Sequence, residues 1–222
     1  MIYKYLRKKK FESYKNFRFL IAISQFLKGE TFKINKDKSI IYILNCGIPR
    51  SGSTLLNLFI KELIKLDIDQ TETYIDDGNS IRKFQKNRTH YVLLKTHRYF
   101  PSVSKYINKG RIVGVMTHRD IRDIVVSLIQ KGWCSDFNYF IQRKELRSMV
   151  LSSIAYSEMK SMNTFSYKDL KNDPVQILME LSFILKIDLD DGKAKEIAQR
   201  LSLGNLKKHT DNISKKRSID VG

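Results

Sequence analysis

The chain has 222 residues, of which 42% are hydrophobic and 11% aromatic, so it can form one domain with a substantial core. This composition argues against disorder of the whole chain. Lys and Arg number 41 against 23 Asp and Glu, and the resulting net charge of +18 favours anionic partners: nucleic acid, anionic lipid, a polyanionic cofactor or an acidic acceptor.

Cysteine and histidine are sparse. Two cysteines, Cys46 and Cys134, give no disulfide framework, so we expect a reducing, cytoplasmic compartment. The histidines show neither the spacing of metal ligands nor a cysteine partner, and we predict no metal site. They are His90, His97, His118 and His209.

The N-terminal segment, residues 1–38, is strongly basic, with eleven Lys and Arg against three Asp and Glu. Its apolar part, Phe17 to Leu27, is interrupted by polar residues and is too short to span a bilayer. No secretory signal is visible. We expect either a helix that packs on the domain or a basic amphipathic segment that contacts anionic membrane. Residues 39–222 then form a single domain.

An apolar, β-branched run from Ile40 to Cys46 predicts a strand that is buried on both faces. The segment Gly47-Ile-Pro-Arg-Ser-Gly-Ser-Thr54 follows it and predicts a loop that leads into a helix near Ser53, with a leucine-rich face as far as Leu66. The unsatisfied amides and the dipole at such a helix start favour an anion. An oxyanion ligand is therefore expected at this loop.

Further strands and helices alternate along the rest of the chain. We expect strands at Tyr91 to Leu94, Arg111 to Thr117 and Asn163 to Tyr167, a strand or loop and a helix within 67–90, and helices after Asp120, across 136–160, from Pro174 to about Lys186 and from Lys193. This alternation, with nearly continuous apolar strands, predicts an α/β fold of three α/β/α layers around a parallel sheet.

The spacing Gly47-x4-Gly52-x-Thr54 is that of a nucleoside triphosphatase phosphate loop, but Ser53 occupies the position of the essential Lys. The only cation is Arg50, on the other side of Gly52. This displacement changes which part of a ligand the cation can reach. ATP or GTP hydrolysis therefore loses support, although a P-loop kinase remains a rival interpretation.

The loop resembles that of sulfotransferases that use 3′-phosphoadenosine 5′-phosphosulfate (PAPS), which reads Pro-(Lys/Arg)-Ser-Gly-(Ser/Thr)-Thr. Lys95-Thr96-His97 is identical to a motif of the cytosolic branch. Arg119-x7-Ser127 is similar to the family's 3′-phosphate site, and Tyr167-Lys-Asp-Leu170 with Asp173-Pro174 is similar to a segment near the adenine. Together, and in this order along the chain, these motifs indicate the family more specifically than the loop alone does.

The resemblance implies a role for each matching residue. His97 would be the base for the acceptor, with Lys95 and Arg50 stabilising the charge that develops during transfer. Arg suits phosphate recognition because its guanidinium can bind in a bidentate fashion. The implied cofactor-binding residues are Arg50, Ser51, Gly52, Ser53 and Thr54 at the 5′-phosphosulfate, Arg119 and Ser127 at the 3′-phosphate, Tyr167 near the adenine, and the late basic residues Lys215, Lys216 and Arg217.

Several positions depart from the cytosolic branch. Arg50 is typical of the tyrosyl-protein branch, and Leu55 replaces a Trp that often stacks on adenine. Glu72 follows the loop at a distance that resembles the glutamate base of the tyrosyl-protein branch. If Glu72 is the base, His97 becomes a positioning residue. The stretch between Thr54 and His97 is short, so the acceptor pocket is not defined by the resemblance. An inactive member of the family is a further alternative.

The sequence therefore predicts transfer of a sulfuryl group from PAPS to a hydroxyl or amine of a small-molecule or glycan acceptor. No metal and no nucleic acid are expected. One rival is a P-loop kinase that binds ATP with Mg²⁺. The other is a basic protein that binds nucleic acid or membrane without catalysis, whose affinity would fall steeply with salt.

Overall fold

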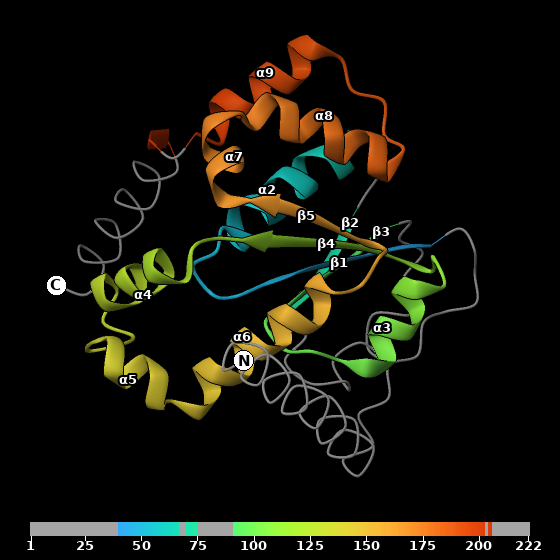
Figure 1. Cartoon of the computed structure of the whole chain (residues 1–222). Coiled ribbons are helices and arrows are strands. Elements are labelled where there is room, and N and C mark those ends of the chain that lie inside the picture. The colour runs from blue at the N-terminus through green and yellow to red at the C-terminus, as the bar shows by residue number, and fades with distance from the viewer. Residues whose placement is uncertain (1–39, 67–69, 75–90, 203, 206–222) are drawn as a thin grey trace, which may run out of the picture.

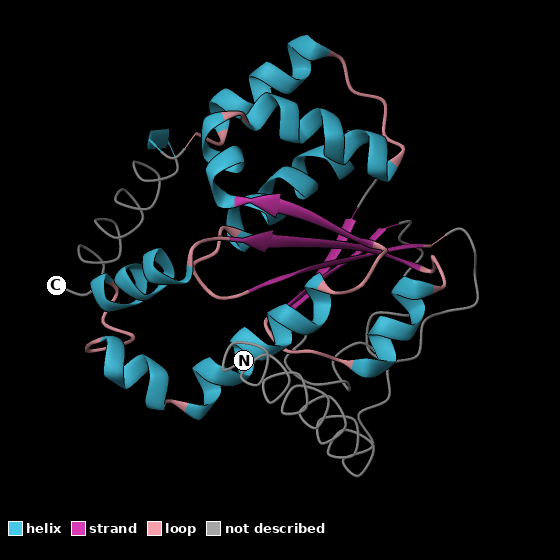
Figure 2. Ribbon diagram, in the orientation of Figure 1, coloured by secondary structure: helices cyan, strands magenta, loops and turns pink. Residues whose placement is uncertain are grey.

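The computed structural model of the chain describes residues 40–66, 70–74, 91–202 and 204–205. Its centre is a five-stranded sheet in the order β2-β3-β1-β4-β5, in which every pair of neighbours is parallel (Figures 1 and 2). The strands are β1 (Ile41–Gly47), β2 (Gln70–Tyr74), β3 (Tyr91–Thr96), β4 (Ile112–His118) and β5 (Met162–Ser166). The predicted α/β fold with a central parallel sheet is confirmed.

Helices cover both faces of the sheet (Figure 1). One face carries α2 (Ser53–Ile64), α7 (Tyr167–Asn172), α8 (Pro174–Leu185) and α9 (Asp191–Arg200). The opposite face carries α3 (Pro101–Asn108) and α6 (Lys144–Ser157). The remaining described helices, α4 (Ile121–Gln130) and α5 (Phe137–Gln142), lie beyond the ends of β4 and β5, on the left of Figure 1.

The apolar strands supply both layers of the core because successive side chains of a strand point to opposite faces. Ile43, Leu93 and Val115 pack towards α2 and α8. Leu44 and Leu94 pack towards α3 and α6. A strand buried on both sides needs apolar residues at every position, which is the pattern that the sequence shows.

Cys46 belongs to the second of these layers and is fully buried, as expected for a small apolar side chain in a central strand. Burial raises the pKa of its thiol far above the ordinary value. The thiol therefore stays protonated and serves packing.

The segment 136–160, expected to be one helix, forms two. Asp136 caps α5 by accepting a hydrogen bond from the amide of Tyr139, and the extended backbone of Arg143 separates α5 from α6. This break lets Phe140 pack against α4, while Tyr156 packs against the sheet. The sequence reading also missed α3 and the short helix α7.

The strand or loop expected within 67–90 is β2, and the helix expected after it would fall on residues 75–90, which lie outside the described residues. The N-terminal segment 1–38 and the predicted basic residues Lys215, Lys216 and Arg217 also lie outside them. No helix of the described part of the chain is both long enough and apolar enough to cross a bilayer.

The main core cluster makes a first prediction about stability. Phe59 of α2 is 1% exposed within that cluster, whereas Phe183 of α8 is 85% exposed. We expect Phe59→Ala to lower the free energy of unfolding by about 3–5 kcal/mol, because it leaves a cavity in a packed core. Phe183→Ala should change it by about 0.5 kcal/mol or less. Denaturant unfolding measures both, and equal effects would contradict this assignment of the core.

Candidate active site

The loop between β1 and α2 contains three residues with positive φ: Gly47 at 146°, Arg50 at 70° and Gly52 at 104°. Gly47 also allows a close approach. A Cβ atom at this position would lie 2.6 Å from Oγ1 of Thr117 and 2.8 Å from Oγ of Ser51. Glycine is therefore required where the loop leaves the strand, both by backbone conformation and by space.

Ser51 and Thr117 tie this loop to the next strand of the sheet. Their hydroxyl oxygens lie 2.6 Å apart in a hydrogen bond, and both residues are at most 1% exposed. Thr117 is in register with Gly47 on the neighbouring strand β4. The amide of Ser51 donates to the carbonyl of Ile48 (3.0 Å) and closes a turn. The side chain of Ser51 thus serves the shape of the loop.

A second buried contact holds the start of α2. The side-chain amide nitrogen of Asn45 donates to the carbonyl of Ser53 (2.8 Å) and to Oδ1 of Asn57 (2.9 Å). Asn45 is fully buried on β1. Burying a polar side chain in an apolar strand costs free energy of folding unless the side chain is hydrogen-bonded. Here the bonds of Asn45 connect β1 to the beginning of α2.

The N-terminus of α2 has the form of an anion site. Gly52 is the N-cap residue and makes no side-chain capping bond, and the helical hydrogen bond from the amide of Leu56 ends on the carbonyl of Gly52. The amides of Ser53, Thr54 and Leu55 precede that bond, so they have no acceptor within the helix. The helix dipole adds partial positive charge at this point.

A cavity of about 200 Å³ opens at this helix start. It brings together residues from the β1–α2 loop, from the first two turns of α2 and from the positions that directly follow β4 and β5. Its lining residues are Arg50, Gly52, Ser53, Thr54, Leu55, Leu58, Arg119 and Tyr167. Six of these were predicted to bind the cofactor, from three motifs far apart in the sequence, and they meet because parallel strands end at one edge of the sheet.

Lys95 and His97 reach the loop from β3. The ammonium group of Lys95 donates to Oγ1 of Thr54 in the first turn of α2 (3.0 Å). Nδ1 of His97 lies 2.6 Å from the carbonyl oxygen of Gly47. A carbonyl oxygen can only accept, so Nδ1 carries a proton and, in the neutral ring, Nε2 holds the basic lone pair.

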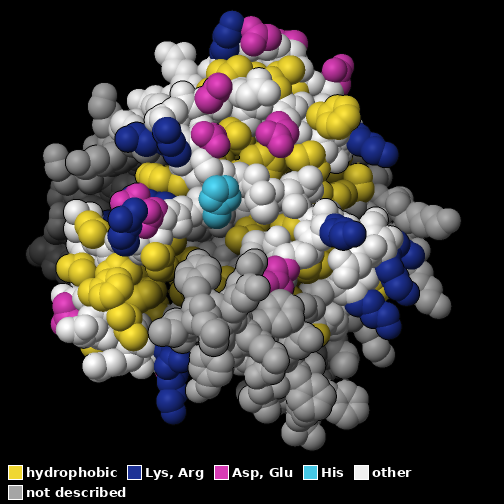
Figure 3. Space-filling model, viewed as in Figure 1, with side chains coloured by type: hydrophobic (Ala, Val, Ile, Leu, Met, Phe, Trp, Pro, Cys, Tyr) yellow, Lys and Arg dark blue, Asp and Glu magenta, His cyan; other side chains and the backbone are white. Residues whose placement is uncertain are grey.

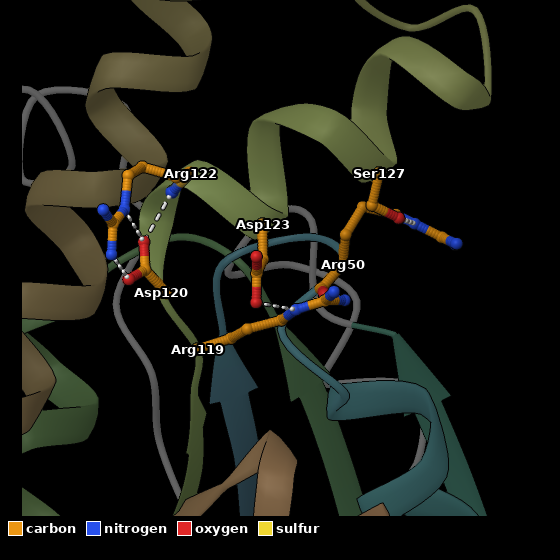
Figure 4. A network of polar contacts seen from close by, with 6 residues as sticks. All are labelled: Arg50, Arg119, Asp120, Arg122, Asp123 and Ser127. Atoms are coloured by element: carbon orange, nitrogen blue, oxygen red, sulfur yellow. Dashed lines mark hydrogen bonds and ion pairs between the residues drawn. The ribbon is translucent and has the colours of Figure 1, made fainter.

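Arg119 lies half-buried against Tyr167, with its guanidinium carbon 4.2 Å from the centre of the ring. Its Nη1 donates to the carbonyl of Arg50 (3.3 Å), and its Nε lies 3.6 Å from a carboxylate oxygen of Asp123 (Figure 4). In the same network, Nε of Arg50 donates to the hydroxyl of Ser127 (3.0 Å). The loop and the Arg-x7-Ser motif are thus directly joined.

Arg122, the neighbouring cation in the motif, has another role. It forms two side-chain hydrogen bonds with Asp120, the residue that caps α4 (Figure 4). These bonds lower the pKa of Asp120 to about 2, so the carboxylate stays ionised at neutral pH. Arg122 and Asp120 therefore form an exposed helix cap, while Arg119 faces the cavity.

Other predicted residues are placed only in part. Glu72 lies on β2 in register with Leu93 of β3, four residues before His97, and its side chain is outside the described part. The sequence reading missed Asn45 and Thr117. The signal that could have found them is a polar residue near the end of an otherwise apolar strand. Among the side chains that are described, no group of three or more His, Cys, Asp and Glu could hold a metal.

Comparison with solved structures shows the fold. The mouse sulfotransferase SULT7A1, crystallised with 3′-phosphoadenosine 5′-phosphate (PAP), is 20% identical, with a TM-score of 0.56 over 80% of this chain and 68% of that one. Retinol dehydratase with retinol and PAP is 13% identical, with a TM-score of 0.60 over 81% and 70%. Retinol dehydratase with androsterone and PAP is also 13% identical, with a TM-score of 0.55 over 83% and 71%.

No curated protein is similar enough to be matched to the chain. The family model described as "Sulfotransferase domain" matches residues 41–220. This range includes the whole sheet and all the motifs quoted above, and the basic N-terminal segment precedes it. The chain therefore belongs to the sulfotransferase domain family, and the predicted membership of this family is confirmed.

Proposed function

We propose that this chain transfers a sulfuryl group from PAPS to a hydroxyl or amine of a small-molecule or glycan acceptor. One observation carries the proposal. In a member of the sulfotransferase family, residues of the loop, of the Arg-x7-Ser motif and of the Tyr-x-Asp-Leu motif line one cavity at the carboxyl edge of the sheet. These are the groups that a nucleotide with phosphates on both its 3′ and 5′ positions requires.

The 5′-phosphosulfate would bind at the start of α2. The amides of Ser53 to Leu55 point along the helix axis, and Lys95 is held at this turn by its bond to Thr54. Sulfuryl transfer, like phosphoryl transfer, leaves the protein mainly to position the reactants and to stabilise the charge that grows on the bridging oxygen. In this proposal Lys95 and Arg50 meet that charge.

The 3′-phosphate would bind Arg119 and Ser127. Asp123 and the stacked Tyr167 hold the guanidinium of Arg119 in place, which lowers the entropic cost of binding a phosphate. Ser127 is linked through Arg50 to the 5′ side of the site. The predicted contribution of Lys215, Lys216 and Arg217 remains a proposal from sequence alone.

The base would be His97. Because the Gly47 carbonyl fixes the proton on Nδ1, Nε2 is the nitrogen that can accept the proton of the acceptor hydroxyl. PAPS supplies the sulfuryl group. The acceptor oxygen bonds to sulfur as its proton passes to Nε2, and the leaving 5′-phosphate oxygen takes the electrons of the broken bond. Glu72 is the alternative base.

Support for a small-molecule acceptor comes from a distant neighbour, since retinol dehydratase has been crystallised with retinol and with androsterone. A glycan acceptor, the cytoplasmic location and contact of the N-terminal segment with anionic membrane remain predictions.

Substitution of His97 tests the assigned base. In His97→Asn the side-chain amide can still donate to the Gly47 carbonyl, but no group replaces Nε2. We expect PAP binding to be retained and PAPS turnover with an acceptor panel to fall by about 100-fold or more. Glu72→Gln is the matched variant. If Glu72→Gln loses turnover and His97→Asn keeps it, the roles are reversed.

The buried tie between Thr117 and Ser51 gives another prediction. Thr117→Val has nearly the same shape but leaves the Ser51 hydroxyl without this partner, so the loop amides lose their fixed positions. We expect PAP affinity to fall by about tenfold, corresponding to about 1.4 kcal/mol, and Thr117→Ser to restore it. Calorimetric titration measures the affinity. Full affinity in Thr117→Val would show that the tie does not position the loop.

A further inference from the structure

Hydrophobic side chains on the surface are concentrated in one part of the chain. Of the nine large hydrophobic side chains that are exposed in the described residues, seven lie on α4, on α5 or in the turn between them. We call these seven the α4–α5 patch: Ile121, Val126, Ile129, Trp133, Phe137, Tyr139 and Ile141. Figure 3 shows yellow side chains gathered over these two helices.

The inner side of the same two helices is already packed. Ile124, Leu128 and Phe140 are buried in a small core cluster of their own. The α4–α5 unit therefore carries apolar side chains both in its own core cluster and on the surface. Trp133, at the centre of the segment, is 58% exposed. A concentration of exposed apolar side chains usually marks an interaction surface.

Cations accompany the patch. Lys131 follows α4, and Arg143, Lys144 and Arg147 follow α5, all four exposed. Arg143 lies over the ring of Tyr139, 5.0 Å from its centre, and 4.0 Å from a carboxylate oxygen of Glu145. From Ile121 to Arg147 the acidic residues are Asp123, which lies near Arg119, Asp136, which caps α5, and Glu145, which lies near Arg143.

We infer that the α4–α5 patch is a docking face for the surface of an anionic lipid bilayer. Exposed Trp, Phe, Ile and Tyr bordered by Lys and Arg match the chemistry of the interface, where apolar side chains enter below the headgroups and cations meet them. Each cation near an anionic surface adds attraction. The inference is independent of the proposed catalytic function.

Charge decides between a bilayer and a second copy of the chain. A symmetric pair that buried this patch would bring the four cations of each copy close to those of the other, between two chains that each carry +18. Electrostatic repulsion between these two sets of cations would oppose the pairing. An anionic bilayer covers the same apolar side chains and neutralises the same cations.

The chain provides its own reporter, because Trp133 is its only tryptophan and lies within the patch. The full chain is mixed with vesicles of phosphatidylcholine alone or with phosphatidylserine added. We expect Trp133 emission to move to shorter wavelength with the anionic vesicles, and brominated lipid to quench it. Neutral vesicles should give a much weaker response, and added salt should reduce the anionic one.

Variants separate this face from the rest of a basic chain. The double variant Phe137→Ser with Ile141→Ser removes two half-exposed anchors and should weaken vesicle binding by about tenfold or more. Phe183→Ser removes an equally large exposed side chain outside the patch and should leave binding unchanged. Far-UV circular dichroism and denaturant unfolding of every variant report whether the fold is retained.

Three results would overturn the inference. Co-sedimentation with vesicles but no change in Trp133 emission would place the contact elsewhere, as on the basic N-terminal segment. Unchanged vesicle binding of the double variant would do the same. A Trp133 emission that changes with protein concentration in the absence of lipid, together with a dimer in sedimentation, would show that a second copy covers the patch.

Discussion

The close approach of β1, β4 and the loop at Gly47 is the constraint on which the site depends. A glycine without Cβ lets the loop turn within hydrogen-bonding distance of Thr117, and the bond between Ser51 and Thr117 then fixes that turn. Asn45 holds the first turn of α2 from the same side. The proposed anion site is therefore preorganised by buried hydrogen bonds rather than by the ligand, which is what electrostatic catalysis requires.

The cations around this loop are held by defined partners. Thr54 positions Lys95, Ser127 positions Arg50, and Asp123 with Tyr167 positions Arg119. An arrangement of this kind gives up little side-chain entropy when an anion binds. The proposed site thus gathers a few positioned cations within a chain whose net charge is +18.

Much of this could be predicted from the sequence. Continuous apolar strands predict the parallel sheet, and the ends of three such strands predict that the loop, Lys95 and Arg119 meet at one edge. Local patterns did not predict α3 and α7, which are short, or the break at Arg143, which depends on where Phe140 finds a core. The roles of Asn45 and Thr117 were not predicted, because each depends on hydrogen-bond partners that come close only in the folded chain.

The most direct test of the proposed function is a calorimetric titration of the full chain with PAP, with adenosine 5′-phosphate and with ATP and Mg²⁺, repeated for Arg119→Ala. We predict saturable binding of PAP, about tenfold to a hundredfold tighter than that of adenosine 5′-phosphate, because charge-assisted bonds to the 3′-phosphate are lost in the latter. Arg119→Ala should remove most of this preference. Equal binding of the two adenosine phosphates, or a preference for ATP with Mg²⁺, would contradict the proposed PAPS site.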